Sequence, residues 1–172
     1  MKRFWNGLFG GTGADKGVTG PLYDAIVARG REPHWYLTGG VADTMDGRFD
    51  MIAAVLAFVL IRLEADPAAA AEAVELTERF IDDMDAQLRQ SGVGDVGIGK
   101  YVGQMVSMLG GRIGAYREGL ASGDLRTPVL RNLYRGIDPG QAAIDHVIAA
   151  LTAFAGRLRE QPTRVIIAGQ LP

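Results

Sequence analysis

Residues 48–64, RFDMIAAVLAFVLIRLE, decide the fold of this chain. Their apolar side chains occur around most of the circumference of a helix instead of along one stripe, which indicates a helix covered by other elements on several sides. The uncharged run from Met51 to Ile61 has 11 residues, whereas a helix that spans a bilayer needs roughly 20. We therefore predict a buried central helix. Its apolar positions are Met51, Ile52, Val55, Leu56, Phe58, Val59, Leu60 and Leu63.

Segments on both sides of this helix predict further helices, each with a recognisable start. Pro21 opens a helix over residues 21–31, because proline at the first helical position loses no hydrogen bond there. Asp66 and Pro67 end the central helix and begin the next one, since aspartate is a good N-cap and proline suits the first turn. That next helix carries its apolar residues along one stripe. The stripe consists of Ala73, Leu76, Phe80, Met84 and Leu88.

The second half of the chain continues this pattern. Asp95 is predicted to cap one long helix, and Pro128 to open a short one. Asp138 and Gln141 resemble a capping box before the last long helix. No alternation of apolar and polar residues with a period of two extends beyond a few positions. The predicted fold class is therefore all-α, a compact single-domain bundle of six or seven helices.

Three parts are expected along the chain. Residues 1–17 are predicted to be a flexible N-terminal segment, because glycine is frequent between positions 10 and 17. Residues 18–160 form the helical domain, in which Trp35 and Tyr36 are expected on a short turn between Pro33 and a glycine pair. Residues 161–172 are predicted to be a tail, because the β-branched stretch 164–168 has no partner strand in the sequence.

The composition excludes several classes of function. The chain has no cysteine, which removes thiol nucleophiles and cysteine-rich zinc sites. The two histidines, His34 and His146, are far apart in sequence and outside any HExxH pair. A net charge of −2 lacks the basic excess from which phosphate-backbone binding draws its affinity. We therefore expect no catalytic residue, no metal, no cofactor and no recognition of nucleic acid sequence.

Two further motifs invite chemical interpretations. The glycine-rich loop at residues 11–17 does not match a phosphate loop, because Lys16 is followed by glycine instead of serine or threonine. Asp82, Asp83 and Asp85 lie on one helical turn, where they could hold a hard cation or form a solvated acidic face. Successive helix positions are rotated by about 100°, so three ligands there would not converge without a second segment. A divalent-cation-dependent helical enzyme at Asp82–Asp85 is the alternative function.

The N-terminal aromatic residues allow two interpretations. Phe4, Trp5 and Phe9 follow the cations Lys2 and Arg3, and this combination could place the rings at a lipid headgroup boundary. The chain would then be a peripheral membrane-binding module. A frayed terminus is the other interpretation, because a helix of one or two turns is marginal in water.

Three segments carry a resemblance to a known family. The first is residues 43–50, DTMDGRFD; the second is Asp83-Met84-Asp85 with Leu88-Arg89; the third is residues 92–95, GVGD, with Gly99-Lys100. In this order, between about residues 22 and 120, they resemble the ubiquinol-cytochrome c chaperone family. The resemblance implies a non-catalytic helical protein that holds newly made cytochrome b during assembly of the respiratory bc1 complex.

The matched segments and their neighbours contain the predicted partner-binding residues. Arginine and aromatic residues are enriched at interface cores, so we expect Arg48, Phe49, Lys100 and Tyr101 to border an apolar groove that covers the client. The same segments also have structural interpretations, with Asp46 as a helix cap. The full set of predicted contacts is Arg48, Phe49, Asp50, Arg89, Asp95, Lys100 and Tyr101.

The resemblance also implies where the protein acts and with which partners. Mitochondrial members meet cytochrome b as it leaves the ribosome and work with a small co-chaperone, so both are candidate partners. No targeting extension precedes the domain in this sequence. We therefore expect a bacterial-type member that is cytoplasmic, with possible peripheral contact at the inner face of the cell membrane.

Overall fold

The computed structural model describes residues 17–90 and 95–172, with side chains described outside residues 87–102. The described ranges are helical and contain no strand. In chain order the elements are α1 (Gly20–Gly30), α2 (Pro33–Leu37), α3 (Met45–Glu64), the 3-10 helix η1 (Pro67–Ala69), α4 (Ala70–Gln90), α5 (Asp95–Ser122), α6 (Arg126–Asn132), α7 (Gln141–Glu160) and α8 (Thr163–Ile167). The all-α prediction is confirmed.

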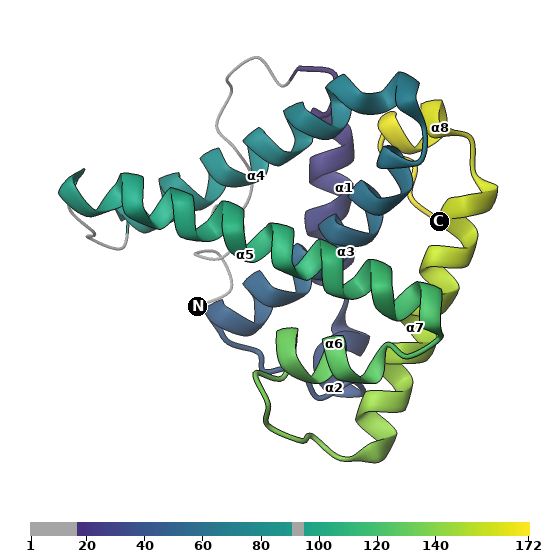
Figure 1. Cartoon of the computed structure of the whole chain (residues 1–172). Helices are drawn as coiled ribbons and strands as arrows, with labels where there is room; N and C mark the ends of the chain where they lie inside the picture. Colours follow the sequence, from purple (N-terminus) through teal and green to yellow (C-terminus); the bar gives the residue numbers. More distant parts are fainter. Residues whose placement is uncertain (1–16, 91–94) are drawn as a thin grey trace.

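Helix α3 is the axis of the domain, as its sequence predicts. It contacts α1, α4, α5 and α7, and every residue from Asp50 to Leu60 is buried. Figure 1 shows α4 and α5 side by side, extending together beyond the other helices. Burying each large apolar side chain contributes about 1.5–3 kcal/mol, so α3 with its four helical neighbours supplies much of the driving force for folding.

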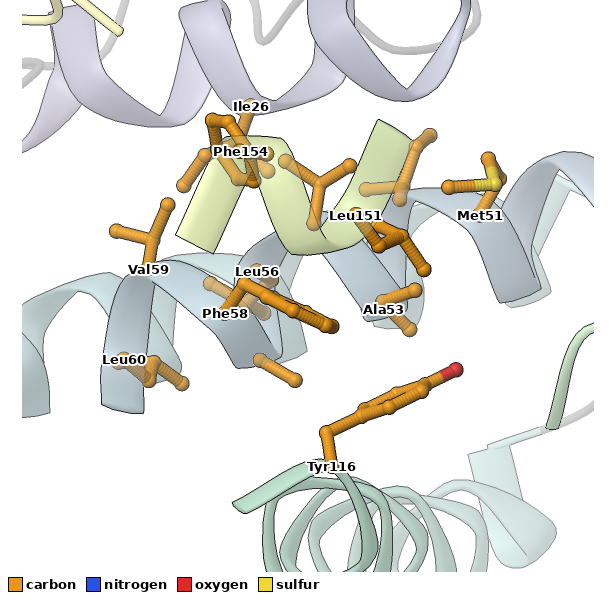
Figure 2. Packing of buried hydrophobic residues seen from close by; sticks show 14 of the residues in the cluster. Ile26, Met51, Ala53, Leu56, Phe58, Val59, Leu60, Tyr116, Leu151 and Phe154 are labelled. Atoms are coloured by element: carbon orange, nitrogen blue, oxygen red, sulfur yellow. The ribbon is translucent and has the colours of Figure 1, made fainter. Parts of the chain in front are cut away.

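The packing around α3 uses aromatic side chains from the helices that cover it. Figure 2 shows Phe58 of α3 facing Tyr116 of α5, and the ring centroids of the two lie 5.2 Å apart. Phe154 of α7 lies against α1, where the Arg29 guanidinium is 4.9 Å from the centre of its ring. Ile26 is 0% exposed, and Phe58, Tyr116 and Phe154 are at most 2% exposed. The core is therefore continuous from α1 through α3 to α5 and α7.

Two short helices differ from the predicted turn and tail. Trp35 and Tyr36 lie on α2, where Pro33 occupies the first turn. Residues 163–167 form α8, and Ile166 on it is completely buried. The predicted tail, residues 161–172, thus contains a short helix, because a β-branched run followed by Gly169 can close one helical turn when its apolar side packs on the core. Gly169 has φ +82° and lies directly against Pro21.

Arg62 fixes the junction between α7 and α8. Its Nε donates to the Leu158 carbonyl at 2.9 Å, and its Nη2 donates to the Gln161 carbonyl at 3.0 Å. Thr163 Oγ1 donates in turn to Asp66 Oδ2 at 2.5 Å. The two hydrogen bonds from Arg62 satisfy carbonyl groups that the C-terminus of α7 leaves without helical partners. The C-terminal segment is thereby attached to the end of α3.

Helix starts follow the predicted chemistry at some positions and not at others. Asp66 accepts a hydrogen bond from the Ala68 amide, as expected of an N-cap. Thr44, and not Asp46, caps α3 by accepting from the Gly47 amide at 3.1 Å. The expected capping box before α7 does not form, because Gly140 occupies the N-cap position and Asp138 accepts from the Gly140 amide.

Candidate functional site

The start of α3 is shaped by a close approach of the preceding loop. A Cβ at Gly47 would lie 1.9 Å from the Ala42 carbonyl oxygen, so only glycine fits between the first turn of the helix and the loop. The side chain of Asp46 sits in that first turn, where the helix dipole favours a negative charge. The first turn of α3 therefore packs tightly against Ala42 of the preceding loop.

Asp50 is a charged residue whose side chain is buried in the core. Its side chain is 0% exposed, and it accepts hydrogen bonds from Arg112 Nη2 at 2.5 Å and from Arg135 Nε at 2.7 Å. Arg112 is itself 12% exposed, and its guanidinium lies 5.4 Å from the ring centre of Phe49. A buried carboxylate is tolerated only when it is paired and hydrogen-bonded, and two arginines meet that requirement here. Asp50 thereby links α3, α5 and the segment after α6.

Arg135 is held in an unusual backbone conformation. Its φ is +52°, and it is the only non-glycine residue with positive φ in the described ranges. Such a conformation costs on the order of 1 kcal/mol or more and persists when surrounding contacts determine it. Those contacts are Asp50 and also Asp46, whose Oδ2 accepts from Arg135 Nη1 at 2.9 Å. The hydrogen bond to Asp50 is the main cause that raises the pKa of Arg135 above its ordinary value.

A pocket of about 340 Å³ lies beside these charges, and we call it the Asp50 pocket. Its walls come from the loop before α3, the first turns of α3 and the connection between α6 and α7. They combine three charged side chains with small and apolar ones. The lining residues are Gly40, Ala42, Thr44, Asp46, Gly47, Asp50, Leu133, Tyr134, Arg135, Ile137 and Pro139.

Three large apolar side chains are exposed on the segments that line this pocket or close to them in the sequence. Ile137 lines the pocket and is 75% exposed. Met45, between the lining residues Thr44 and Asp46, is 52% exposed, and Leu37, at the end of α2, is 84% exposed. We call Leu37, Met45 and Ile137 the apolar rim. Large exposed apolar side chains that form one patch are typical of a surface that binds another polypeptide.

The part of the wall that comes from the loop before α3 is fixed by the residues around Gly39. Tyr134 Oη donates to the Gly39 carbonyl at 2.5 Å, and the Val41 amide donates to the Trp35 carbonyl at 3.1 Å. Trp35 Nε1 in turn donates to the Arg29 carbonyl at 2.8 Å. Burial raises the pKa of Tyr134 to about 12. The loop that carries Gly40 and Ala42 is therefore tied to α1, α2 and the connection after α6.

The predicted binding residues around α3 have structural partners. Arg48 Nε donates to Asp43 Oδ1 at 2.6 Å, and that bond raises the pKa of Arg48. Phe49 packs on Phe80 of α4, with 5.7 Å between ring centroids. Neither Arg48 nor Phe49 lines the Asp50 pocket, whereas Asp50 does. The groove expected between Arg48, Phe49, Lys100 and Tyr101 is thus not the pocket found beside this segment.

The other predicted contacts lie outside the part that the structure describes. For Arg89, Asp95, Lys100 and Tyr101 this holds for the side chains, and for Phe4, Trp5 and Phe9 it holds for the whole residues. Their roles stay predictions. Sequence reasoning missed Arg112, Arg135 and Ile137. The sequence did contain a signal for the tight turn at Arg135, namely the glycine that follows it at position 136. Glycine adopts positive φ readily, and both residues have positive φ in this turn.

The acidic turn on α4 does not assemble a cation site in the described part of the chain. Asp83 Oδ2 accepts a hydrogen bond from Tyr23 Oη of α1 at 2.7 Å. Burial, with a further contribution from Asp83, raises the pKa of Tyr23 well above its usual value. The described residues contain no cluster of three or more histidine or carboxylate side chains able to hold a metal ion. Asp83 instead joins α4 to α1.

Among the helices of the described ranges, none combines the length and the apolarity that crossing a bilayer requires.

Comparisons with known proteins agree with this arrangement. The family model described as ubiquinol-cytochrome C chaperone matches residues 38–171, which include the Asp50 pocket. The fold is similar to the crystal structure of the Cbp3 homolog from Brucella abortus, with a TM-score of 0.79 and 30% sequence identity over 90% of this chain and 87% of that one. A comparison with curated proteins found no match. On the family match and the shared fold, the chain belongs to the ubiquinol-cytochrome c chaperone family.

Proposed function

We propose that this protein is a non-catalytic assembly chaperone of the respiratory bc1 complex and that its client is newly made cytochrome b. Membership of the ubiquinol-cytochrome c chaperone family supports the general role. The single structural observation that supports client binding is the exposure of the apolar rim, whose three large side chains are between 52% and 84% exposed and of which Ile137 lines the Asp50 pocket. We propose that this rim is the client-binding surface.

The chemistry of the pocket suits an apolar polypeptide segment. A cytochrome b that has not yet met its partner subunits exposes apolar side chains, and covering them suppresses aggregation. Leu37, Met45 and Ile137 supply apolar contact area for such a segment. Arg135 supplies hydrogen bonds, because two of the five N–H donors of its guanidinium serve Asp50 and Asp46 and the group is half exposed. A client backbone carbonyl is a suitable acceptor for the others.

The charges beneath the pocket have a positioning role in this proposal. Asp50 holds Arg135 in its left-handed conformation, and Gly47 keeps the loop before α3 close to the helix. A preorganised surface binds more tightly because fewer side chains must be ordered on association. Gly47 and Asp50 of the DTMDGRFD segment thus act by shaping the site, whereas Met45 of the same segment belongs to the rim that makes the contact.

The place of action follows from the nature of the client. Cytochrome b is inserted into the membrane, so we propose that the chaperone works in the cytoplasm at the inner face of the cell membrane. Phe4, Trp5 and Phe9 remain candidates for peripheral contact with lipid. The ribosome and a small co-chaperone remain candidate partners.

A genetic experiment tests this function. The gene is deleted in the organism that encodes the chain, and the level of bc1 complex is measured by native gel electrophoresis and by the b-type haem spectrum. Wild-type protein is expected to restore the complex, and the double variant Leu37→Asp/Ile137→Asp is expected not to. Val106→Asp on α5, a position that is 46% exposed, is the matched control and is expected to restore it. Unchanged bc1 levels in the deletion strain would refute the proposed function.

A further inference from the structure

The two histidines of the chain meet at the junction of α2 and α7. His34 Nδ1 lies 3.0 Å from His146 Nε2, although the residues are 112 positions apart. The rings are arranged edge to face, with centroids 5.2 Å apart and an interplanar angle of 74°. The second nitrogen of His34, Nε2, lies 3.0 Å from Glu32 Oε2. The result is a chain of contacts from a carboxylate through one imidazole to another.

We propose that His34 and His146 form a binding site for a divalent transition-metal ion, with Nδ1 of His34 and Nε2 of His146 as ligands. Two metal–nitrogen bonds of about 2.0–2.1 Å that meet at about 90–110° place the two nitrogen atoms about 2.8–3.4 Å apart. The 3.0 Å separation falls in this range. The two ligands come from different helices, so the ion would bridge α2 and α7.

The environment of His34 is that of a metal ligand. Metal-binding histidines commonly donate their other ring N–H to a carboxylate, which fixes the tautomer and raises the basicity of the ligating nitrogen. Glu32 occupies that position at His34 Nε2. Glu32 is oriented in turn by Arg29 Nη1, which lies 3.3 Å from its other carboxylate oxygen. The carboxylate is thus already aligned for the role.

The proton balance is simple for the neutral pair. Without metal, one N–H lies between the facing nitrogens, and His34 Nε2 donates to Glu32. Metal binding requires both facing nitrogens to be unprotonated, so that proton moves through solvent to Nδ1 of His146 and none is lost. The side chain of His34 is 35% exposed, so water can reach the site and complete the coordination.

The chemistry of the ligands limits the ion. Imidazole nitrogen suits Zn²⁺, Ni²⁺ and Cu²⁺, whereas Mg²⁺ and Ca²⁺ prefer oxygen. Within the first group the usual order of affinity places Cu²⁺ above both Ni²⁺ and Zn²⁺. We therefore expect binding of these three ions and none of Mg²⁺.

An ion at this site would stabilise one wall of the Asp50 pocket. The loop that follows α2 packs closely on α7, since a Cβ at Gly39 would lie 2.7 Å from Val147 Cγ2. The next residue, Gly40, lines the pocket. A bridge between α2 and α7 would therefore hold this loop in place. The metal site does not depend on the proposed chaperone function, and either can fail without the other.

Calorimetric titration of the full chain, free of any histidine tag, tests the site with NiCl₂ and ZnCl₂. We expect saturable binding of one ion per chain, lost in His34→Gln and in His146→Gln. Glu32→Gln is expected to weaken binding by about 10–100-fold, as is usual when the partner of a ligating histidine is removed. Glu160→Gln, an equal charge change at the exposed far end of α7, is the matched control and is expected to bind as wild type does.

A second measurement keeps the test valid if a variant folds poorly. Paramagnetic Ni²⁺ is expected to broaden the NMR signals of His34 and His146 in the wild-type protein before those of other residues. The ion is also expected to raise Tm, because it binds the folded state. Absence of saturable binding by the wild type, retention of that binding in the folded histidine variants, or broadening centred elsewhere would each overturn the proposal.

Discussion

Arg135 Nε donates to Asp50 Oδ2 at 2.7 Å and thereby joins the centre of the core to a half-exposed loop 85 residues further along the chain. The Asp50 side chain has no solvent exposure, whereas the Arg135 side chain is 51% exposed. Through it, the packing of α3 determines the shape of the Asp50 pocket. Stability and client binding are therefore expected to be coupled at this point.

Replacing Asp50 by asparagine is expected to destabilise the protein by about 3–5 kcal/mol, because Arg112 would remain buried without a compensating charge. Asp46→Asn is the matched control, since Asp46 contacts the same Arg135 but is 73% exposed. Exposed pairs of this kind contribute about 0–1 kcal/mol. Urea unfolding followed by circular dichroism measures the free energy of unfolding of both variants. Equal losses below 1 kcal/mol for the two variants would contradict the assigned role of Asp50.

Two glycine substitutions on long helices are expected to have opposite effects. Gly47→Ala places a Cβ against the Ala42 carbonyl and is expected to lower the free energy of unfolding and distort the pocket. Gly111→Ala on α5 meets no atom within 4 Å, and alanine is favoured over glycine inside a helix by about 1 kcal/mol. That variant is expected to raise the free energy of unfolding. Thermal unfolding curves distinguish the two, and a stabilised Gly47→Ala protein would show that the loop is not held against α3.

Truncating Ile166 on α8 is expected to cost about 2–5 kcal/mol, as for other fully buried isoleucines changed to alanine. Arg164→Ala, an exposed position on the same short helix, is the control and is expected to change stability little. Equilibrium unfolding in urea provides the measurement. If the Ile166→Ala protein were as stable as wild type, the last 12 residues would behave as the tail that the sequence predicts.

Four tyrosines with raised pKa values are expected to make the stability of the protein fall at alkaline pH. Burial raises the pKa of Tyr36 and of Tyr134 to about 12, and burial also raises the pKa values of Tyr23 and Tyr116. A tyrosine in the unfolded chain loses its proton near pH 10. The stabilisation is thus fully present below about pH 10 and is lost as the pH rises from there to about 12. The urea midpoint is expected to fall over that range.

The variant Tyr134→Phe distinguishes the loss of stability caused by tyrosine ionisation from losses that have other causes at alkaline pH. The variant is expected to show a shallower fall above pH 10, together with a loss of about 1 kcal/mol at neutral pH from the missing bond to the Gly39 carbonyl. Tyrosinate absorbance measures ionisation directly. Ionisation of every tyrosine near pH 10 in the folded protein would show that these side chains are not buried as described.

The helices that could be predicted are those whose signals are local. An apolar run such as 51–61 and a cap such as Asp66 act within one or two helical turns, so the sequence identified α3 and the start of η1. The two five-residue helices could not be recognised in this way. α2 and α8 depend on the burial of Trp35 and Ile166 against residues distant in sequence.

The candidate site was predicted only in part for the same reason. The DTMDGRFD segment was identified, and Asp50 within it lines the pocket. Its partners Arg112 and Arg135 are 62 and 85 positions away, and no periodicity connects them with Asp50. Ile137 and the other rim residues have no sequence signature, because only the fold decides that they remain exposed.

Site-specific photo-crosslinking tests the central claim most directly. A photoreactive amino acid is placed at Ile137 on the apolar rim, and in a second protein at Glu160 on the exposed end of α7. Both are expressed in cells that assemble the bc1 complex, and the crosslinked products are identified by mass spectrometry. The account predicts that cytochrome b is captured from position 137 and not from position 160. Absence of cytochrome b at position 137, with protein that is folded and restores bc1 assembly, would contradict the proposed client-binding surface.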